Sequence, residues 1–81
     1  MTAMRDLVTP FASTLKRLET EPAVLIPEER LREAYRDTRI GKSVREALAR
    51  QLPSTVGREE VRFLRIPGHV MLVNPRNAAI L

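Results

Sequence analysis

The chain has 81 residues, with 14 Lys and Arg against 10 Asp and Glu and a formal net charge of +4, which suits one small domain with a single core. It contains no cysteine, which excludes a disulfide framework, a thiolate zinc site and a cysteine nucleophile and makes the cytoplasm the default compartment. No apolar run is longer than four residues, whereas a spanning helix needs about 20, so we expect no membrane segment and no secretory signal.

A first helix is expected over about residues 9–20. Apolar side chains recur there and just before it at intervals of three and four, the spacing of one helix face, and they are Met4, Leu7, Val8, Phe11, Leu15 and Leu18. Thr9 and Pro10 suit the N-cap and the first helical position, where the missing N–H of proline costs nothing. The helix therefore either begins at Pro10 or is kinked there, with a short turn or helix before it.

The next apolar run, residues 23–26, lies between Pro22 and Pro27 and is too short for a helix. It predicts a short strand. Pro27 then opens a second helix with glutamates at 28 and 29 in its first turn, where negative charge complements the helix dipole. The apolar stripe of this helix consists of Leu31, Ala34 and Tyr35.

A third helix is expected over residues 43–52, after a turn at Gly41. Ser43 and Glu46 stand in the S-x-x-E relation of a capping box, so Ser43 is interpreted as the N-cap and not as a nucleophile. The core-facing side chains of this helix are Val44, Ala47, Leu48 and Leu52. Two helices joined by a short turn that contains glycine form a helix-turn-helix arrangement.

The C-terminal part of the chain predicts a hairpin. Residues 61–66 and 69–73 are β-branched or apolar runs on either side of Pro67-Gly68. A Pro-Gly pair prefers a type II turn, which suits a tight hairpin poorly, so a longer or irregular tip is expected. Asn74-Pro75 ends the second strand, and the apolar end of the tail either folds back on the core or meets another subunit.

The positive charge is concentrated in one region. Residues 1–38 carry six basic and seven acidic side chains, whereas residues 39–65 carry seven basic and three acidic ones. Such a regional excess is typical of proteins that bind a polyanion, because neutralised phosphates release counterions. The alternative is that these side chains are simply solvated surface charges.

The succession of elements resembles a winged helix-turn-helix domain. Its parts are "AVLI" as the first strand, "PEERLREAY" and "GKSVREALARQL" as the second and third helices, and "VRFLRIPGHVMLV" as the wing. The sequence of the second and third helices, "IPEERLREAYRD" and "GKSVREALARQLP", is also similar to winged-helix modules of phage and plasmid replication or primase-associated proteins. The resemblance implies a single α+β domain over residues 1–81, with a core of about 9–74 and a tail of 75–81. It also implies a small transcriptional or replication regulator that binds double-stranded DNA.

In such a domain the third helix enters the major groove and the wing lies along an adjacent groove or the backbone. The resemblance therefore assigns the candidate contacts to Lys42, Arg45, Ala49 and Arg50 on the helix, Arg62, Arg65 and His69 on the wing, and Arg39 and Arg58 as phosphate contacts. Arginine pairs with guanine edges, while the other contacts supply affinity without sequence preference. The acidic Glu46 shares the helix face.

An enzyme is not expected. His69 is the only histidine, which excludes a histidine metal cluster and disfavours a catalytic triad, and no phosphate-binding or dinucleotide glycine motif is present, so no cofactor is expected. The rival hypothesis is a phage- or plasmid-type protein-interaction module that inhibits or adapts a host protein. A homodimer through the first helix or the tail is a further expectation, because one small module contacts few base pairs.

Overall fold

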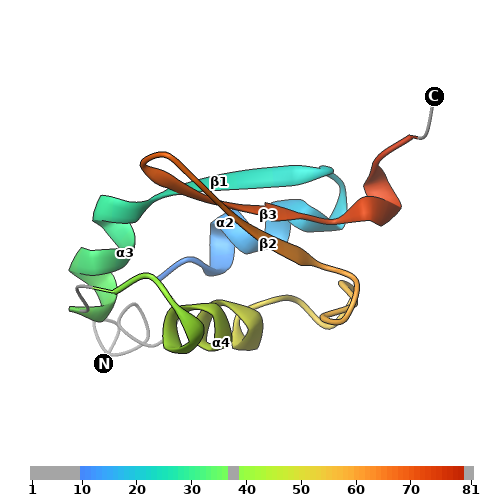
Figure 1. Cartoon of the computed structure of the whole chain (residues 1–81). Coiled ribbons are helices and arrows are strands. Elements are labelled where there is room, and N and C mark those ends of the chain that lie inside the picture. The colour runs from blue at the N-terminus through green and yellow to red at the C-terminus, as the bar shows by residue number, and fades with distance from the viewer. Residues whose placement is uncertain (1–9, 37–38, 80–81) are drawn as a thin grey trace.

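The computed structural model describes residues 10–36 and 39–79, and these form an α+β fold in which three α-helices accompany a three-stranded antiparallel sheet (Figure 1). In chain order the elements are α2 (Ala12–Lys16) with a 3₁₀ turn (Arg17–Glu19), β1 (Ala23–Pro27), α3 (Glu28–Tyr35), α4 (Lys42–Arg50), β2 (Arg62–Ile66), β3 (His69–Val73) and a last 3₁₀ turn (Pro75–Asn77). Within these described ranges, no helix has the length and apolar character needed to cross a membrane.

The last strand lies in the middle of the sheet, whose order is β1-β3-β2. Val24 of β1 and Phe63 of β2 both pair with Leu72 of β3. Because side chains alternate along a strand, one face of the sheet carries the buried positions and the opposite face carries the residues between them. The strands β1 and β2 are therefore the two edges of the sheet.

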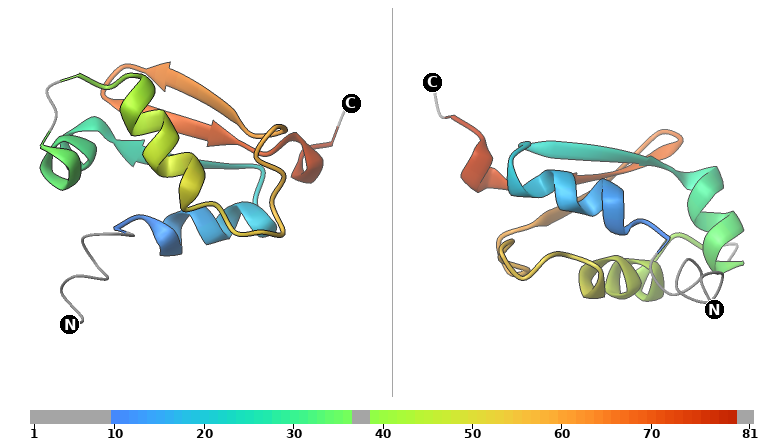
Figure 2. Two further views of the ribbon diagram at one scale, coloured as in Figure 1. Left: turned by 90° about the horizontal axis from the view of Figure 1, so that it is seen from below. Right: turned by 180° about the vertical axis from the view of Figure 1, so that it is seen from behind.

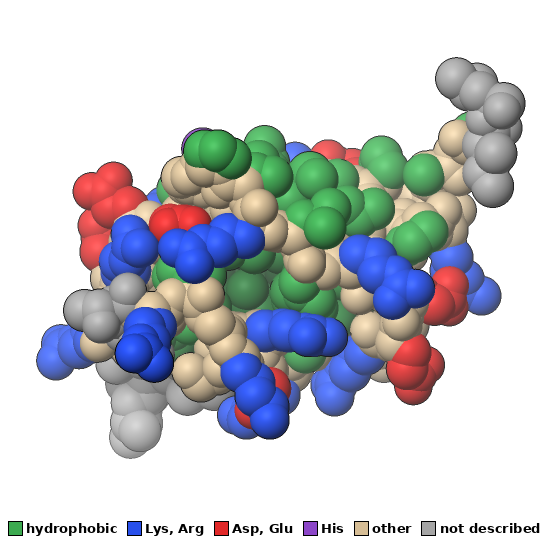
Figure 3. Space-filling view, viewed as in Figure 1, with side chains coloured by type: hydrophobic (Ala, Val, Ile, Leu, Met, Phe, Trp, Pro, Cys, Tyr) green, Lys and Arg blue, Asp and Glu red, His purple; other side chains and the backbone are tan. Residues whose placement is uncertain are grey.

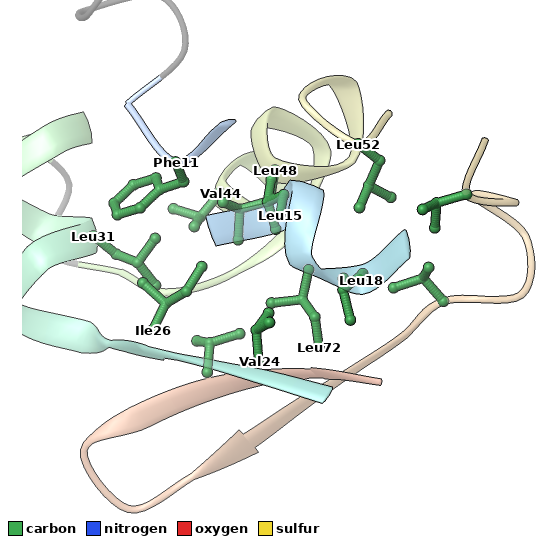
Figure 4. Close-up of a cluster of buried hydrophobic side chains, with 13 residues drawn as sticks. Phe11, Leu15, Leu18, Val24, Ile26, Leu31, Val44, Leu48, Leu52 and Leu72 are labelled. Carbon is green, nitrogen blue, oxygen red and sulfur yellow. The ribbon is translucent and has the colours of Figure 1, made fainter. Parts of the chain in front are cut away.

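The core fills the space between the inner face of this sheet and the helices. In Figure 2, α2 and α4 lie across one face of the strands and α3 lies at one end of the sheet. Thirteen hydrophobic residues are buried there, and Figure 4 shows those from α2, α3 and α4 directed toward those from β1 and β3. The fully buried side chains are Leu15, Leu18, Ile26, Leu31, Leu48 and Leu72. The predicted core stripes of all three helices are thus confirmed at their central leucines.

The first helix starts later than the sequence predicted. Phe11 is the N-cap of α2 and no side chain caps this end, while Thr9 lies outside the described residues. The amide of Phe11 donates instead to Oε1 of Gln51, 3.0 Å away at the end of α4. A tertiary hydrogen bond therefore satisfies a donor that a local cap was expected to satisfy.

The predicted capping box of the third helix is wrong. Gly41 is the N-cap of α4, and its carbonyl accepts the amide hydrogen bond of Arg45 at 3.0 Å. Ser43 therefore lies inside the first turn, two positions after the N-cap. Glycine is itself a favoured N-cap residue, and Lys42 is a better helix former than serine, so the helix begins at Lys42.

The hairpin tip is tight, contrary to the expectation of an irregular one. Ile66 pairs directly with His69, which leaves only Pro67 and Gly68 in the loop, and Gly68 adopts φ +77°, the value that a type II turn needs at its third residue. The Gly68 carbonyl accepts a 3.0 Å hydrogen bond from the amide of Glu28. The start of α3 thus holds the tip of the hairpin, which offsets the poor match between turn and strand twist.

Candidate nucleic-acid interface

The exposed face of α4 is the centre of the candidate site. Val44 and Leu48 are buried, so the helix turns its other side outward. Residues three and four apart share a helix face, and the outward side chains are Lys42, Arg45, Glu46, Ala49 and Arg50. Four of them, Lys42, Arg45, Glu46 and Ala49, line one shallow hollow on the helix surface.

Arg45 connects this face to the hairpin. The guanidinium carbon of Arg45 lies 5.5 Å from the ring centroid of Phe63 on β2. At that distance a cation is attracted by the negative face of the aromatic ring. The contact orients the arginine without neutralising its charge.

A groove runs between α4 and β2, and we call it the α4–β2 groove. Its volume is about 420 Å³, and it is lined by Ile40, Gly41, Lys42, Val44, Arg45, Leu48, Phe63, Leu64, Arg65 and Val70. Figure 3 shows a hollow with a hydrophobic floor on this side of the molecule, surrounded by Lys and Arg side chains. The groove therefore combines an apolar floor with a basic rim.

Arg65 is engaged in an ion pair inside the protein. Its Nε lies 2.8 Å from Oε2 of Glu28, and Arg32 approaches the other carboxylate oxygen at 3.2 Å. The hydrogen bond from Arg65, together with the two positive charges, lowers the pKa of Glu28, and the same bond raises the pKa of Arg65. Glu28 therefore balances part of the charge of Arg65. The same ion pair fastens the hairpin to α3, while Arg65 also lines the groove.

The other two wing candidates face away from the core. Arg62 pairs with Val73 and His69 pairs with Ile66, positions that alternate with the buried Val70 and Leu72. The His69 ring contacts the Pro67 carbonyl at 3.3 Å through Nδ1. The structure therefore does not bring Arg62 or His69 onto the surface that α4 presents.

The remaining two candidate cations, Arg39 and Arg58, precede and follow α4 in the chain. Arg39 is exposed and lines a hollow beside the start of the helix together with Lys42 and Glu46, whereas Arg58 is exposed in the loop after the helix. Considering residues 10–36 and 39–79 only, five of the candidate cations form no ion pair with an acidic side chain, and they are Lys42, Arg45, Arg50, Arg58 and Arg62. Their charges are therefore available to a partner.

Sequence reasoning missed the residues that hold this arrangement together. Gln51 joins three elements, because it accepts from the Phe11 amide at 3.0 Å and donates to the Tyr35 hydroxyl at 2.6 Å and to the Ala47 carbonyl at 3.1 Å. Its main partners are 40 and 16 residues away, so no local pattern could have indicated them. The aromatic Phe63 was predicted only as a strand residue, although it forms part of the groove floor.

The outer face of the sheet carries an exposed apolar row. Leu25, Met71 and Leu64 lie side by side in register across the three strands. Leu25 is 51% exposed and Leu64 is 45% exposed. No described element covers this row. Exposed clusters of this kind often mark interaction surfaces.

The described part of the chain contains no group of three or more histidine or acidic side chains that could hold a metal ion. Comparison of the chain with protein-family models, with curated proteins and with solved structures found no match.

Proposed function

We propose that this protein binds double-stranded DNA as a winged helix-turn-helix module and acts as a small transcriptional or replication regulator. The order of elements, with α3 and α4 in succession and then a hairpin, supports the proposal. The nine residues of α4 form a helix about 14 Å long, and the diameter of an α-helix with its side chains, about 10–12 Å, matches the width of the major groove of B-DNA, about 12 Å.

The observation that carries the proposal is the unpaired basic surface around α4. Four exposed cations on or just after α4, Lys42, Arg45, Arg50 and Arg58, form no ion pair with an acidic side chain in the described residues, and a local excess of positive charge attracts polyanions. Here Lys42 and Arg45 lie on one helix face, and the contact with the Phe63 ring favours one orientation of the Arg45 guanidinium. An arginine side chain that is already ordered loses less conformational entropy when it contacts DNA.

The proposed roles follow from these positions. On a random-sequence duplex, Lys42, Arg45 and Arg50 contact the phosphates that flank the major groove, and at a specific site they also reach base edges, while Arg39 and Arg58 contact further phosphates. Glu46, exposed between the cations, accepts a hydrogen bond from the amino group of cytosine, as acidic side chains do in the major groove. Arg65 acts through its ion pair with Glu28 by positioning the hairpin.

The proposal is tested by the salt dependence of binding to a labelled random-sequence duplex. Each phosphate contact contributes about 0.9 to the slope of log K against log salt. Replacing both Arg45 and Arg50 by alanine should therefore reduce the slope by roughly 2. The matched control replaces Arg17 and Arg76, which removes the same charge from arginines paired with Glu21 at 2.7 Å and Glu60 at 3.4 Å. The control should leave the slope close to that of the unaltered protein.

The apolar row on the outer sheet face favours a second candidate function, protein interaction. We take a second copy of the chain as the partner, because a row that crosses three antiparallel strands can match itself about a twofold axis. The first helix gives less support to a dimer, since Leu15 of α2 and its N-cap Phe11 are buried.

The face measures only about 17 Å by 14 Å from the strand spacings, below the area of a stable interface. Dimerisation through it should therefore need high micromolar protein. Sedimentation velocity over a concentration series should detect a dimer that Leu25→Glu abolishes and Thr20→Glu, an exposed control, does not. A monomer at all concentrations would exclude this candidate.

A further inference from the structure

The strand that borders the α4–β2 groove has an open edge. β2 pairs only with β3 in the described sheet, so its other side lacks a partner strand there. In an antiparallel pair, residues alternate between those whose main-chain groups bond to the neighbour and those whose groups point away. A two-residue loop is flanked by a bonded pair, here Ile66 and His69, so the main-chain groups of Phe63 and Arg65 point outward.

These outward groups lie at the groove itself. Phe63, Leu64 and Arg65 all line it from the strand side. The side chains of Phe63 and Arg65 belong to the inner face of the sheet, because they pair with Leu72 and Val70. An extended chain laid along β2 would therefore find hydrogen-bonding partners on the strand and apolar side chains beneath it.

The chemistry of the walls specifies what such a chain would carry. The floor is apolar, made by Val44, Leu48, Phe63 and Val70. The rim is basic, with Lys42 and Arg45 on the helix side and Arg65 on the strand side, and none of the ten residues that line the groove is acidic. Apolar side chains at alternate positions would enter the floor, and acidic residues on either side of them would meet the rim.

We propose that the α4–β2 groove binds an extended acidic peptide segment of a partner protein, which adds a fourth strand to the open edge of β2. Strand addition obtains affinity from main-chain hydrogen bonds and specificity from pockets for alternate side chains. The three strand residues that line the groove span about 10 Å, so the contact is short and the binding weak, in the high micromolar range. Because Lys42 and Arg45 serve both partners, the peptide competes with DNA.

The test uses the full-length ¹⁵N-labelled protein and the synthetic peptide acetyl-Asp-Glu-Val-Thr-Ile-Glu-Asp-amide. Titration should shift the amide resonances of Phe63, Leu64 and Arg65. Paired residues on neighbouring strands direct their side chains to the same face, so the peptide's valine and isoleucine, which would enter the apolar floor, pair with Phe63 and Arg65. The main-chain amides of this valine and isoleucine therefore face β2. N-methylation of those two amides should abolish binding, whereas N-methylation of the threonine should be tolerated.

Two charge reversals separate this groove from the surrounding basic surface. Arg45→Glu should weaken peptide binding about tenfold, because attraction becomes repulsion at the rim. Arg58→Glu, at an exposed loop arginine that does not line the groove, should leave peptide binding unchanged while it weakens DNA binding. A folded circular dichroism spectrum is required of both variants.

The proposal is overturned if millimolar peptide shifts none of the three amides, if both N-methylated peptides bind equally, or if a lysine-for-acid peptide binds as well. It is also overturned if random-sequence duplex, and not peptide, shifts these amides. Salt-sensitive DNA binding without peptide binding would remove this inference and leave the proposed function standing. Peptide binding without DNA binding would do the reverse.

Discussion

Two asparagines near the C-terminus are expected to stabilise the fold cooperatively. Asn74 is 3% exposed, and its Nδ2 donates to the Leu18 carbonyl at 2.9 Å. The Nδ2 of Asn77 donates to the same carbonyl at 2.7 Å and to the Glu21 carbonyl at 3.1 Å. Leu18 is fully buried, so water cannot replace these donors. The two side chains together tie the end of β3 to the turn that precedes β1.

The expected free energies follow from what each substitution leaves unpaired. Asn74→Ala or Asn77→Ala alone removes hydrogen bonds worth about 1 kcal/mol but leaves the Leu18 carbonyl with one donor. The double substitution leaves that buried carbonyl with neither donor, which costs a further 1–2 kcal/mol or so. The double variant should therefore lose roughly 3–4 kcal/mol, more than the sum of the single variants.

Urea unfolding followed by circular dichroism measures these differences, since the chain has no tryptophan. A coupling free energy of about 1–2 kcal/mol is expected between the two positions. Each single substitution should lower Tm by about 4–8 °C in a domain of this size. Additive losses, equal within about 0.5 kcal/mol, would refute the reasoning that both asparagines serve one buried acceptor.

Three further predictions concern single residues. The hydrogen bond from Arg65 and the charges of Arg65 and Arg32 lower the pKa of Glu28, so the ionised carboxylate stabilises the fold above its ordinary pKa of 4.5, and this stability is lost as the pH falls through the lowered pKa. The urea midpoint should therefore fall more steeply below pH 4.5 for the unaltered protein than for Glu28→Gln. Equal falls would contradict this. Burial raises the pKa of Tyr35 above 10.0, and because it is the only tyrosine, absorbance titration at alkaline pH should give one midpoint above that value; a midpoint at or below it would show that the ring is solvated. Gly68→Ala should cost about 1 kcal/mol, since φ is +77° there; a loss in urea unfolding below about 0.3 kcal/mol would argue against the positive φ.

The elements that follow from local patterns were predictable from the sequence. The two prolines that enclose β1, the leucines of α3 and α4 and the apolar runs of the hairpin all act through spacing along the chain, and the structure places strands and helices there. The mixed fold class is confirmed for the same reason.

The features that depend on distant partners were not predictable. The late start of α2 depends on Gln51, forty residues away. The tight tip depends on the Glu28 amide, and the ion pair of Arg65 depends on the Glu28 carboxylate, which local reasoning assigned to the helix dipole alone. The sheet register also separates His69 from α4, which a count of basic residues in the hairpin does not reveal.

The DNA-binding proposal is tested most directly by comparing two double variants of equal net charge on one random-sequence duplex. Anisotropy is measured between about 50 and 200 mM salt, over which phosphate contacts weaken strongly. The account predicts that alanine at Arg45 and Arg50 reduces the salt slope by roughly 2 while alanine at the ion-paired Arg17 and Arg76 does not. Equal slopes for the two variants, or no binding by the unaltered protein at low salt, would contradict it.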